Sequence, residues 1–298
     1  MEELLRSLRL PESEDWLPNL HLPVLSTEDI DWGSIGPVFD PARGGRISGR
    51  RALRKQRQVE AFAHIARSLV PGGCIVDAAS GAGNLAIGMA GIMGPHYSFL
   101  AIDVNPRALW QLEQRVANES VSIGTVCSDL MDPSLELPPE ASMVCSLHGC
   151  GAVSDVALQL AVAANLPFCI SPCCTAKAVV RRTPGLDSLA SMQRSAAPSE
   201  IVYPRSKWLR SQGVHEDDYE RLAAIADVGL GPQTPDDQRQ HQQRAKWTIE
   251  LDRLQAVPDH YAVGLVRLRD HEDYGKQEVL VGAPRAGFES KLRSILCQ

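Results

Sequence analysis

The stretch CIVDAASGAGNLAI, from Cys74 to Ile87, decides the fold of this chain. Its first half is a short apolar run that predicts a buried strand, and a helix begins near Asn84. Between them, Gly81 and Gly83 let the backbone approach a ligand, and the helix N-terminus behind the loop offers N–H groups that lack helical partners. A strand, a glycine turn and a helix in this order predict a ligand-binding unit.

Strand-like and helical segments alternate on the C-terminal side of this loop. Further strands are predicted at residues 97–104, 121–130, 141–148 and 166–172. Two closing runs, 261–268 and 277–284, are joined by a short polar segment that suits a hairpin and not a crossover helix. The predicted fold class is therefore α/β, with a doubly wound, Rossmann-like sheet of seven strands in which a C-terminal hairpin follows five parallel units.

The predicted domain organisation is one large domain behind a short lead-in. Residues 1–44 are rich in Pro, Asp and Glu and lack periodicity, which predicts an extended segment. Residues 45–298 form the domain, and a basic helix is predicted at its start, over 45–70. Residues 175–255 are polar and helix-prone, so we expect a helical insert after the fifth strand that serves as a substrate lobe.

The composition limits the kinds of partner. A net charge of −6 over 298 residues argues against binding nucleic acid through bulk charge alone, although a local basic patch stays open. The sequence has no apolar run long enough to span a bilayer and no signal peptide, so a cytoplasmic location is expected. The eight cysteines are expected to be reduced, because a disulfide framework is rare in such a chain.

Two cofactors fit the glycine loop. Gly81, Gly83 and Ala86 match a dinucleotide fingerprint, and Asp103 follows at the distance of a ribose-binding acid. However, Asp77 lies within the first strand, where it would repel a pyrophosphate but could anchor the cationic methionine end of S-adenosylmethionine.

Two further acids favour S-adenosylmethionine over NAD. Asp103 ends the second strand and could accept both ribose hydroxyls, and Asp129 ends the third, where it suits the adenine amino group. Ligands of such sheets bind outside the carboxyl ends of the strands. We therefore predict S-adenosylmethionine as the cofactor. The predicted cofactor-binding residues are Lys55, Asp77, Ala79, Ser80, Gly81, Gly83, Asp103, Val104, Asn105, Asp129, Leu130, Leu147 and His148.

The stretches SLHGCGAVSD (146–155) and ISPCCTAK (170–177) follow the fourth and fifth predicted strands, so both should face one cleft. A zinc site of His148, Cys150, Cys173 and Cys174 is one interpretation; a nucleophilic cysteine, simple packing and a substrate site are the others. We expect no metal, because a Cys-x-x-Cys pair is absent here and adjacent cysteines rarely bind one tetrahedral ion together.

These two signatures, His-x-Cys-Gly-x-x-Ser-Asp and Pro-Cys-Cys, resemble a class I methyltransferase group that includes tRNA 2′-O-methyltransferases. They are still more similar to the methyltransferase domains of glutathione S-transferase C-terminal domain-containing proteins, which carry similar Ala-Leu-Arg-Lys (here 52–55) and Tyr-Pro-Arg-Ser (here 203–206) elements. Two positions depart from the patterns: Ala79 stands where the glycine loop usually begins, and Leu147 replaces the lysine before the tRNA-enzyme motif.

The resemblance implies methyl transfer from S-adenosylmethionine and, by analogy with the tRNA enzymes, an RNA substrate. A protein or small-molecule acceptor and a non-catalytic binding module stay open. The predicted catalytic residues are His148, as a base or orienter held by Asp155 or by backbone, with Asp155 and Cys150. The predicted substrate residues are Arg54, Pro172, Cys173, Cys174, Lys177, Tyr203 and Arg205. Further basic residues and one stacking aromatic could extend this patch: Arg43 to Arg57, Arg181, Arg182, Lys207, Trp208 and Arg210.

Overall fold

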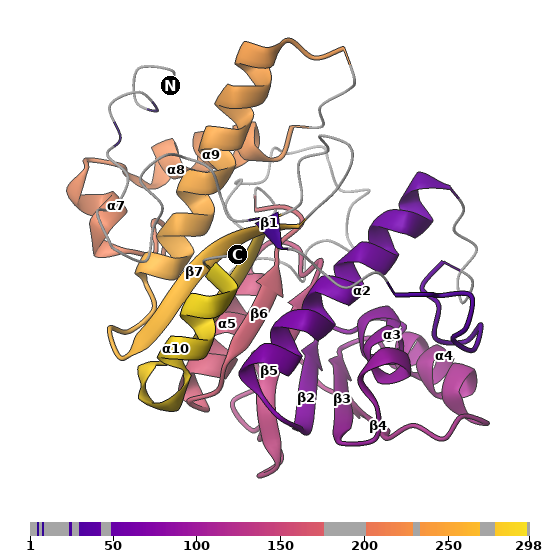
Figure 1. Ribbon diagram of the computed structural model, residues 1–298. Helices are drawn as coiled ribbons and strands as arrows, with labels where there is room; N and C mark the ends of the chain where they lie inside the picture. Colours follow the sequence, from indigo (N-terminus) through magenta and orange to yellow (C-terminus); the bar gives the residue numbers. More distant parts are fainter. Residues whose placement is uncertain are drawn as a thin grey trace.

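The protein is built around one mixed sheet with helices on both faces (Figure 1). The computed structural model describes residues 5, 8, 24–25, 30–42, 49–175, 201–228, 233–268 and 278–296. The sheet has the strand order β1-β7-β8-β6-β5-β2-β3-β4. Its strands are β1 (Val24–Leu25), β2 (Gly73–Ala78), β3 (Tyr97–Asp103), β4 (Ile123–Cys127), β5 (Ala141–Leu147), β6 (Phe168–Ser171), β7 (Tyr261–Leu268) and β8 (Glu278–Pro284).

All seven predicted strands are present, and the predicted fold class is confirmed. Strands β2 to β6 pair in parallel, whereas β8 is antiparallel to both β6 and β7. The order reverses beside β2, because β2 pairs with β3 on one side and with β5 on the other. This reversal is the switch point at which ligands bind in doubly wound sheets.

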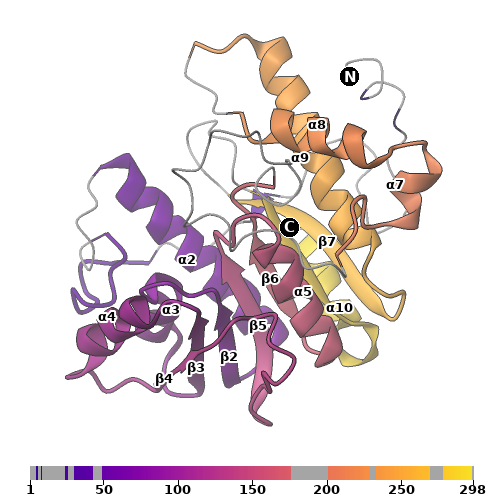
Figure 2. The same cartoon turned by 180° about the vertical axis from the view of Figure 1, so that it is seen from behind.

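The helices are α2 (Arg50–Leu69), α3 (Asn84–Met93), α4 (Pro106–Val116), α5 (Val153–Ala163), α7 (Lys207–Ser211), α8 (Glu216–Ala226), α9 (Asp236–Gln255) and α10 (Arg285–Leu296). Helices α2, α3 and α10 share one apolar core with one face of the sheet, whereas α5 and α9 pack on the other face (Figure 2). Helix α2 buries Phe62, Ile65 and Leu69 at helical spacing, as its sequence pattern predicts.

Part of the N-terminal segment belongs to the folded body. Strand β1 pairs in parallel with β7, which was not predicted because two residues carry no periodic pattern. The indole of Trp32 is 7% exposed and donates to Glu60 Oε1 of α2 at 2.7 Å. Trp32 therefore anchors this segment to α2, and Phe39 lies against Gly91 of α3. Among the helices that the structure describes, none is both long and apolar enough to cross a bilayer.

Two glycines of the loop, Gly81 and Gly83, adopt left-handed backbone conformations. Gly83, the N-cap of α3, has φ +71°, and a Cβ atom there would clash with the Leu112 side chain of α4. Gly81 has φ +56°, but a Cβ atom there would meet open space. Both positions favour glycine, and only Gly83 also needs it for packing.

Replacing each of the two glycines by alanine should separate these effects. Gly81→Ala is expected to lose roughly 1–2 kcal/mol of unfolding free energy from backbone strain. Gly83→Ala should lose roughly 1–3 kcal/mol more because of overpacking against Leu112. Urea denaturation of both variants measures the difference. Equal losses of unfolding free energy in the two variants would show that the Leu112 side chain can move aside without an energetic penalty.

Candidate active site

Three carboxylates lie at the ends of neighbouring strands β2, β3 and β4. Asp77 is 2% exposed, and its Oδ2 accepts a hydrogen bond from the Ala86 amide of α3 at 3.2 Å. Asp103 binds the turn through Oδ2, which accepts from the Gly81 amide at 2.7 Å. Asp129 Oδ1 accepts from the Met131 amide at 3.0 Å. The predicted row of acids along one sheet edge is therefore real.

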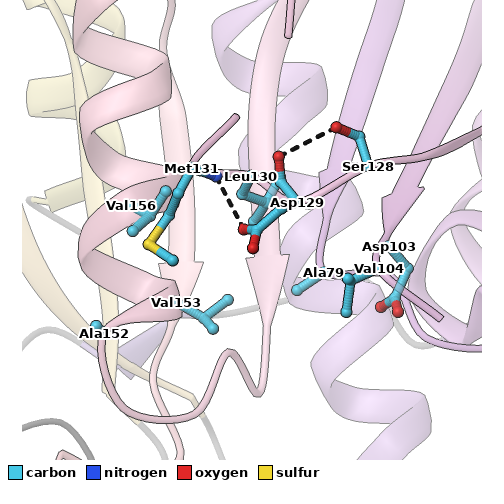
Figure 3. A pocket seen from close by; sticks show the side chains of 10 residues that line it. All are labelled: Ala79, Asp103, Val104, Ser128, Asp129, Leu130, Met131, Ala152, Val153 and Val156. Carbon is cyan, nitrogen blue, oxygen red and sulfur yellow. Dashed lines mark hydrogen bonds between the residues drawn. The ribbon is translucent and has the colours of Figure 1, made fainter. Parts of the chain in front are cut away.

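Two hollows open along this edge. The first, named here the α2 hollow, is lined by Pro41, Lys55, Val59, Asp77, Ser80, Asn84, Leu85, Leu147 and His148. The second, the α5 hollow, is lined by Ala79, Asp103, Val104, Ser128, Asp129, Leu130, Met131, Ala152, Val153 and Val156 (Figure 3). Ala79 lines the α5 hollow, and its neighbour Ser80 lines the α2 hollow. The two hollows therefore lie side by side across the glycine turn.

Asp77 is poised to receive a cation in the α2 hollow. Burial raises its pKa to about 7, the nearby charge of Asp103 adds to the rise, and the Ala86 hydrogen bond only partly opposes it. An ammonium group placed beside this carboxylate would stabilise its ionised form. The surroundings therefore fit the cationic methionine end of S-adenosylmethionine.

The α5 hollow fits a nucleoside. Figure 3 shows Asp103 and Val104 on one side of it and Met131, Val153 and Val156 on the other, with Asp129 between them. Apolar side chains on two sides suit the faces of an adenine ring, while the two carboxylates can accept hydrogen bonds from ribose hydroxyls and the exocyclic amine.

Ala79 adopts φ +61°, a left-handed conformation that non-glycine residues rarely take. Glycine would take this conformation without strain. The methyl group of Ala79 lines the α5 hollow.

Most of the predicted cofactor residues line one of the hollows, but three do not. Gly81 contributes its amide to Asp103, and Gly83 caps α3. The Asn105 side chain accepts from the Arg107 and Ala108 amides and so caps α4. Several lining residues were missed by sequence reasoning. Pro41 and Ser128 carry no pattern, whereas the helical spacing of Ala152, Val153 and Val156 after the fourth predicted strand could have indicated them.

His148 is exposed at the mouth of the α2 hollow. Its Nε2 lies 3.2 Å from Gln58 Oε1 of α2, and its backbone amide donates to the Ser171 carbonyl at 2.9 Å. Its φ of +65° turns the chain sharply after β5. The imidazole is therefore oriented by Gln58 and not by Asp155, which was one of the two partners that the sequence predicted.

Asp155 is a structural residue, which corrects the prediction of a catalytic role. It is fully buried in the first turn of α5 and forms a salt bridge with Arg205 Nη1 at 2.7 Å and another with Arg253 Nη2 at 3.2 Å. The Tyr203 hydroxyl donates to its Oδ2 at 2.8 Å. Tyr203 and Arg205, predicted to bind substrate, therefore join the segment before α7 to α5 instead.

The surrounding charges complete this buried network. Arg253 also binds Glu250 at 2.7 Å, and Glu250 binds Lys246 at 2.9 Å.

The predicted basic patch is smaller than expected, because Arg210 donates to the Pro204 carbonyl and Trp208 packs against two hydrophobic clusters. Arg54 is half-buried on α2. Arg43, Lys177, Arg181 and Arg182 lie outside the described residues.

The loops after β5 and β6 meet as predicted. The Cys150 and Cys173 sulfurs are 2.9 Å apart, and the Cys173 and Cys174 sulfurs are 3.8 Å apart. Pro172 is buried, and its carbonyl accepts from Lys246 Nζ at 3.4 Å. Three other cysteines, Cys74, Cys145 and Cys169, are buried in strands, where they pack as small apolar groups.

Comparisons with known proteins agree with this geometry. Residues 54–180 match a family model described as a methyltransferase domain. The chain is 25% identical over 258 residues to the glutathione S-transferase C-terminal domain-containing protein of Xenopus laevis, covering 86% of this chain and 38% of the relative. The Drosophila melanogaster homolog is 29% identical over 260 residues, covering 85% and 40%. The chain thus spans about two fifths of these relatives.

Similar solved structures include a protein described as an rRNA methylase from Clostridium thermocellum, at 12% identity and a TM-score of 0.39, covering 74% of this chain and 91% of that one. TrmN from Thermus thermophilus has the same identity and TM-score, covering 78% and 52%. Similarity at this level says nothing about the substrate of this chain.

The raised pKa of Asp77 predicts how cofactor affinity depends on pH. Below about pH 7 the carboxyl is protonated in the empty protein, so binding a cation must first release that proton, and affinity falls as pH is lowered. Calorimetric titration with S-adenosylhomocysteine across pH 7 should show affinity rising with pH. In Asp77→Asn this part of the dependence should vanish. Identical pH profiles for the two proteins would refute the assignment.

The structural role of Asp155 predicts a loss of stability without a loss of cofactor. Asp155→Asn is nearly isosteric and breaks two buried ion pairs, with Arg205 and with Arg253, although Arg253 keeps Glu250. The unfolding free energy should therefore fall by roughly 3 kcal/mol. Asp132→Asn, at an exposed turn, serves as the control. Denaturation and S-adenosylhomocysteine titration test both points. Intact stability with abolished methyl transfer would instead return Asp155 to the catalytic machinery.

Proposed function

We propose that this chain, which carries a class I S-adenosylmethionine-dependent methyltransferase domain, methylates RNA. The methyltransferase class, the fold and the cofactor are the premise, and the RNA acceptor is the proposed step. The observation that carries it is a concentration of positive charge on the first turns of α2, beside the α2 hollow.

Cations of α2 and α4 gather around Lys55. Lys55 lines the α2 hollow, and its pKa is lowered by burial and then by the positive charges of Arg115 and Arg54. Arg51 is exposed one helical turn before Lys55. Cations held this close to one another favour an anionic partner, and a nucleic acid backbone supplies such charge at regular intervals.

The roles of the lining residues follow from their positions. When bound, S-adenosylmethionine supplies a methyl group on a sulfonium, and the carboxylates Asp77, Asp103 and Asp129 would hold its ammonium, ribose and adenine groups. The apolar side chains of Val59 and Leu85 exclude water from the α2 hollow. Methyl displacement requires in-line placement of the acceptor above all, and this placement is the main contribution of the site.

His148 is the residue best placed to meet the acceptor. Its ring lies at the mouth of the hollow that contains Asp77, and Gln58 fixes its orientation. An acceptor hydroxyl or amine there could be positioned by a hydrogen bond to the imidazole and lose its proton to it.

Labelled methyl transfer tests the proposal. With S-adenosylmethionine carrying a tritiated methyl group and an extract of RNA and protein, label should appear in a nuclease-sensitive, protease-resistant fraction. Asp103→Ala should lose roughly 10- to 100-fold in cofactor affinity, because a charged hydrogen-bond acceptor is removed. Label in the protease-sensitive fraction would replace RNA with a protein acceptor. Cofactor binding without transfer to any fraction would favour a binding module.

The α2 cations predict the salt dependence of RNA binding. Replacing either Arg51 or Arg54 by alanine should reduce the slope of log affinity against log salt by roughly 0.7–0.9 for each phosphate that the side chain neutralises. Arg221→Ala on α8, whose side chain is 69% exposed, is the matched control and should leave the slope unchanged. Equal slopes in all three variants would contradict an RNA path along α2.

A further inference from the structure

We propose that Cys150, Cys173 and Cys174 form a binding site for a thiophilic metal ion, for which zinc is the best fit. Their three sulfur atoms all lie within 4.8 Å of one another, as in a group of metal ligands. Two of the residues are half-buried and Cys174 is buried, so the group is sheltered but within reach of solvent.

The sheet itself brings the three residues together. β5 and β6 pair in parallel with Leu147 opposite Ser171, so the two loops leave the same edge side by side. Two backbone hydrogen bonds then join the loops: the His148 amide donates to the Ser171 carbonyl at 2.9 Å, and the Gly151 amide donates to the Cys174 carbonyl at 3.0 Å. The thiols are therefore held in place by secondary structure before any ion binds.

The distances are close to those of a zinc thiolate site. Zinc–sulfur bonds of about 2.3 Å in a tetrahedron place the sulfurs about 3.8 Å apart. The Cys173 and Cys174 sulfurs are 3.8 Å apart, so these adjacent residues can share one ion. The Cys150 and Cys173 sulfurs, at 2.9 Å, would need to separate by about 0.9 Å, which a small side-chain rotation provides.

Metal binding at this group is coupled to proton release, since coordinated thiols are deprotonated outright. Each sulfur that binds then releases its proton to solvent.

Spacing along the sequence does not exclude the ion once the chain is folded. A Cys-x-x-Cys pair is needed only where one local loop supplies the ligands, whereas here the loop after β5 gives one thiol and the loop after β6 gives two. Three protein ligands leave a fourth position for water or another group, as in catalytic zinc sites.

Metal binding would also stiffen the cofactor site. The loop that carries Cys150 contributes His148 to the α2 hollow and Ala152 to the α5 hollow. An ion that anchors this loop to β6 fixes one wall of both hollows. We therefore expect removal of the metal to weaken S-adenosylhomocysteine binding.

The test begins with the metal content of the full chain, purified under reducing conditions and measured by elemental mass spectrometry. The protein should contain close to one zinc ion per chain. Replacing zinc by Co²⁺ should give the near-ultraviolet charge-transfer absorption of cobalt thiolates, with an intensity that scales with the number of sulfur ligands.

Single substitutions identify the ligands. Cys150→Ser, Cys173→Ser and Cys174→Ser should each bind zinc at least tenfold more weakly, as measured with a competing chelator, and lose part of the cobalt absorption. Cys127→Ser, at an exposed position on β4, is the matched control and should retain both signals. Circular dichroism checks that each variant is folded. If a variant does not fold, cobalt titration of the unsubstituted protein still tests the proposal.

Two results would overturn the proposal. One is a folded, reduced protein that contains no metal and gives no cobalt–thiolate absorption at saturating Co²⁺. The other is an intact mass lower by two hydrogens, with a Cys150–Cys173 disulfide found in the peptide map of the freshly purified protein. That outcome would make the pair a redox site instead.

Discussion

The parallel pairing of β2 with both β3 and β5 is the constraint on which the rest of the site depends. Because parallel strands all end at the same edge, every loop that follows β2 to β6 must open on one side of the sheet. The glycine turn, Asp103, Asp129 and the loop from His148 share that edge for this reason. The antiparallel strand β8 then lies between β6 and β7 and extends the sheet beyond the parallel strands.

Asp77 and Asp155 are both buried, but they differ in how their charge is compensated. Asp155 is surrounded by Arg205, Arg253 and the Tyr203 hydroxyl, so its charge is compensated within the fold. Asp77 has one amide donor, and the rise of its pKa to about 7 corresponds to about 4 kcal/mol of unfavourable free energy in the ionised form. A bound cation would offset that cost. The fold therefore neutralises Asp155 with its own arginines, whereas Asp77 depends on a ligand for a counter-charge.

Sequence reasoning predicted the sheet and the acids well because both follow from local rules. Apolar runs define strands, and an acid at the end of a parallel strand must lie on the ligand edge. Sequence reasoning failed for Asp155, Tyr203 and Arg205, because the sequence does not show whether the side chain of a motif residue faces a cleft or the core. The turn of α5 buries position 155 fully, and only the packing of α9 against α5 supplies Arg253 as a partner. Pro41 was beyond prediction because its segment has no periodicity and reaches the α2 hollow through tertiary contacts.

The cysteine group illustrates what spacing along the chain does not contain. Spacing predicts no metal, but spacing limits ligands only when they come from one local loop. The register of β5 against β6 sets the sulfur distances here, and register is a property of the sheet that no short motif contains. The same register sets the distance between the thiols and His148, whose carbonyl lies 3.6 Å from Cys173 Sγ. Cys150 follows His148 by two residues, so any ion bound by the thiols would act close to the group proposed to meet the methyl acceptor, and the chemistry of the two loops cannot be treated separately.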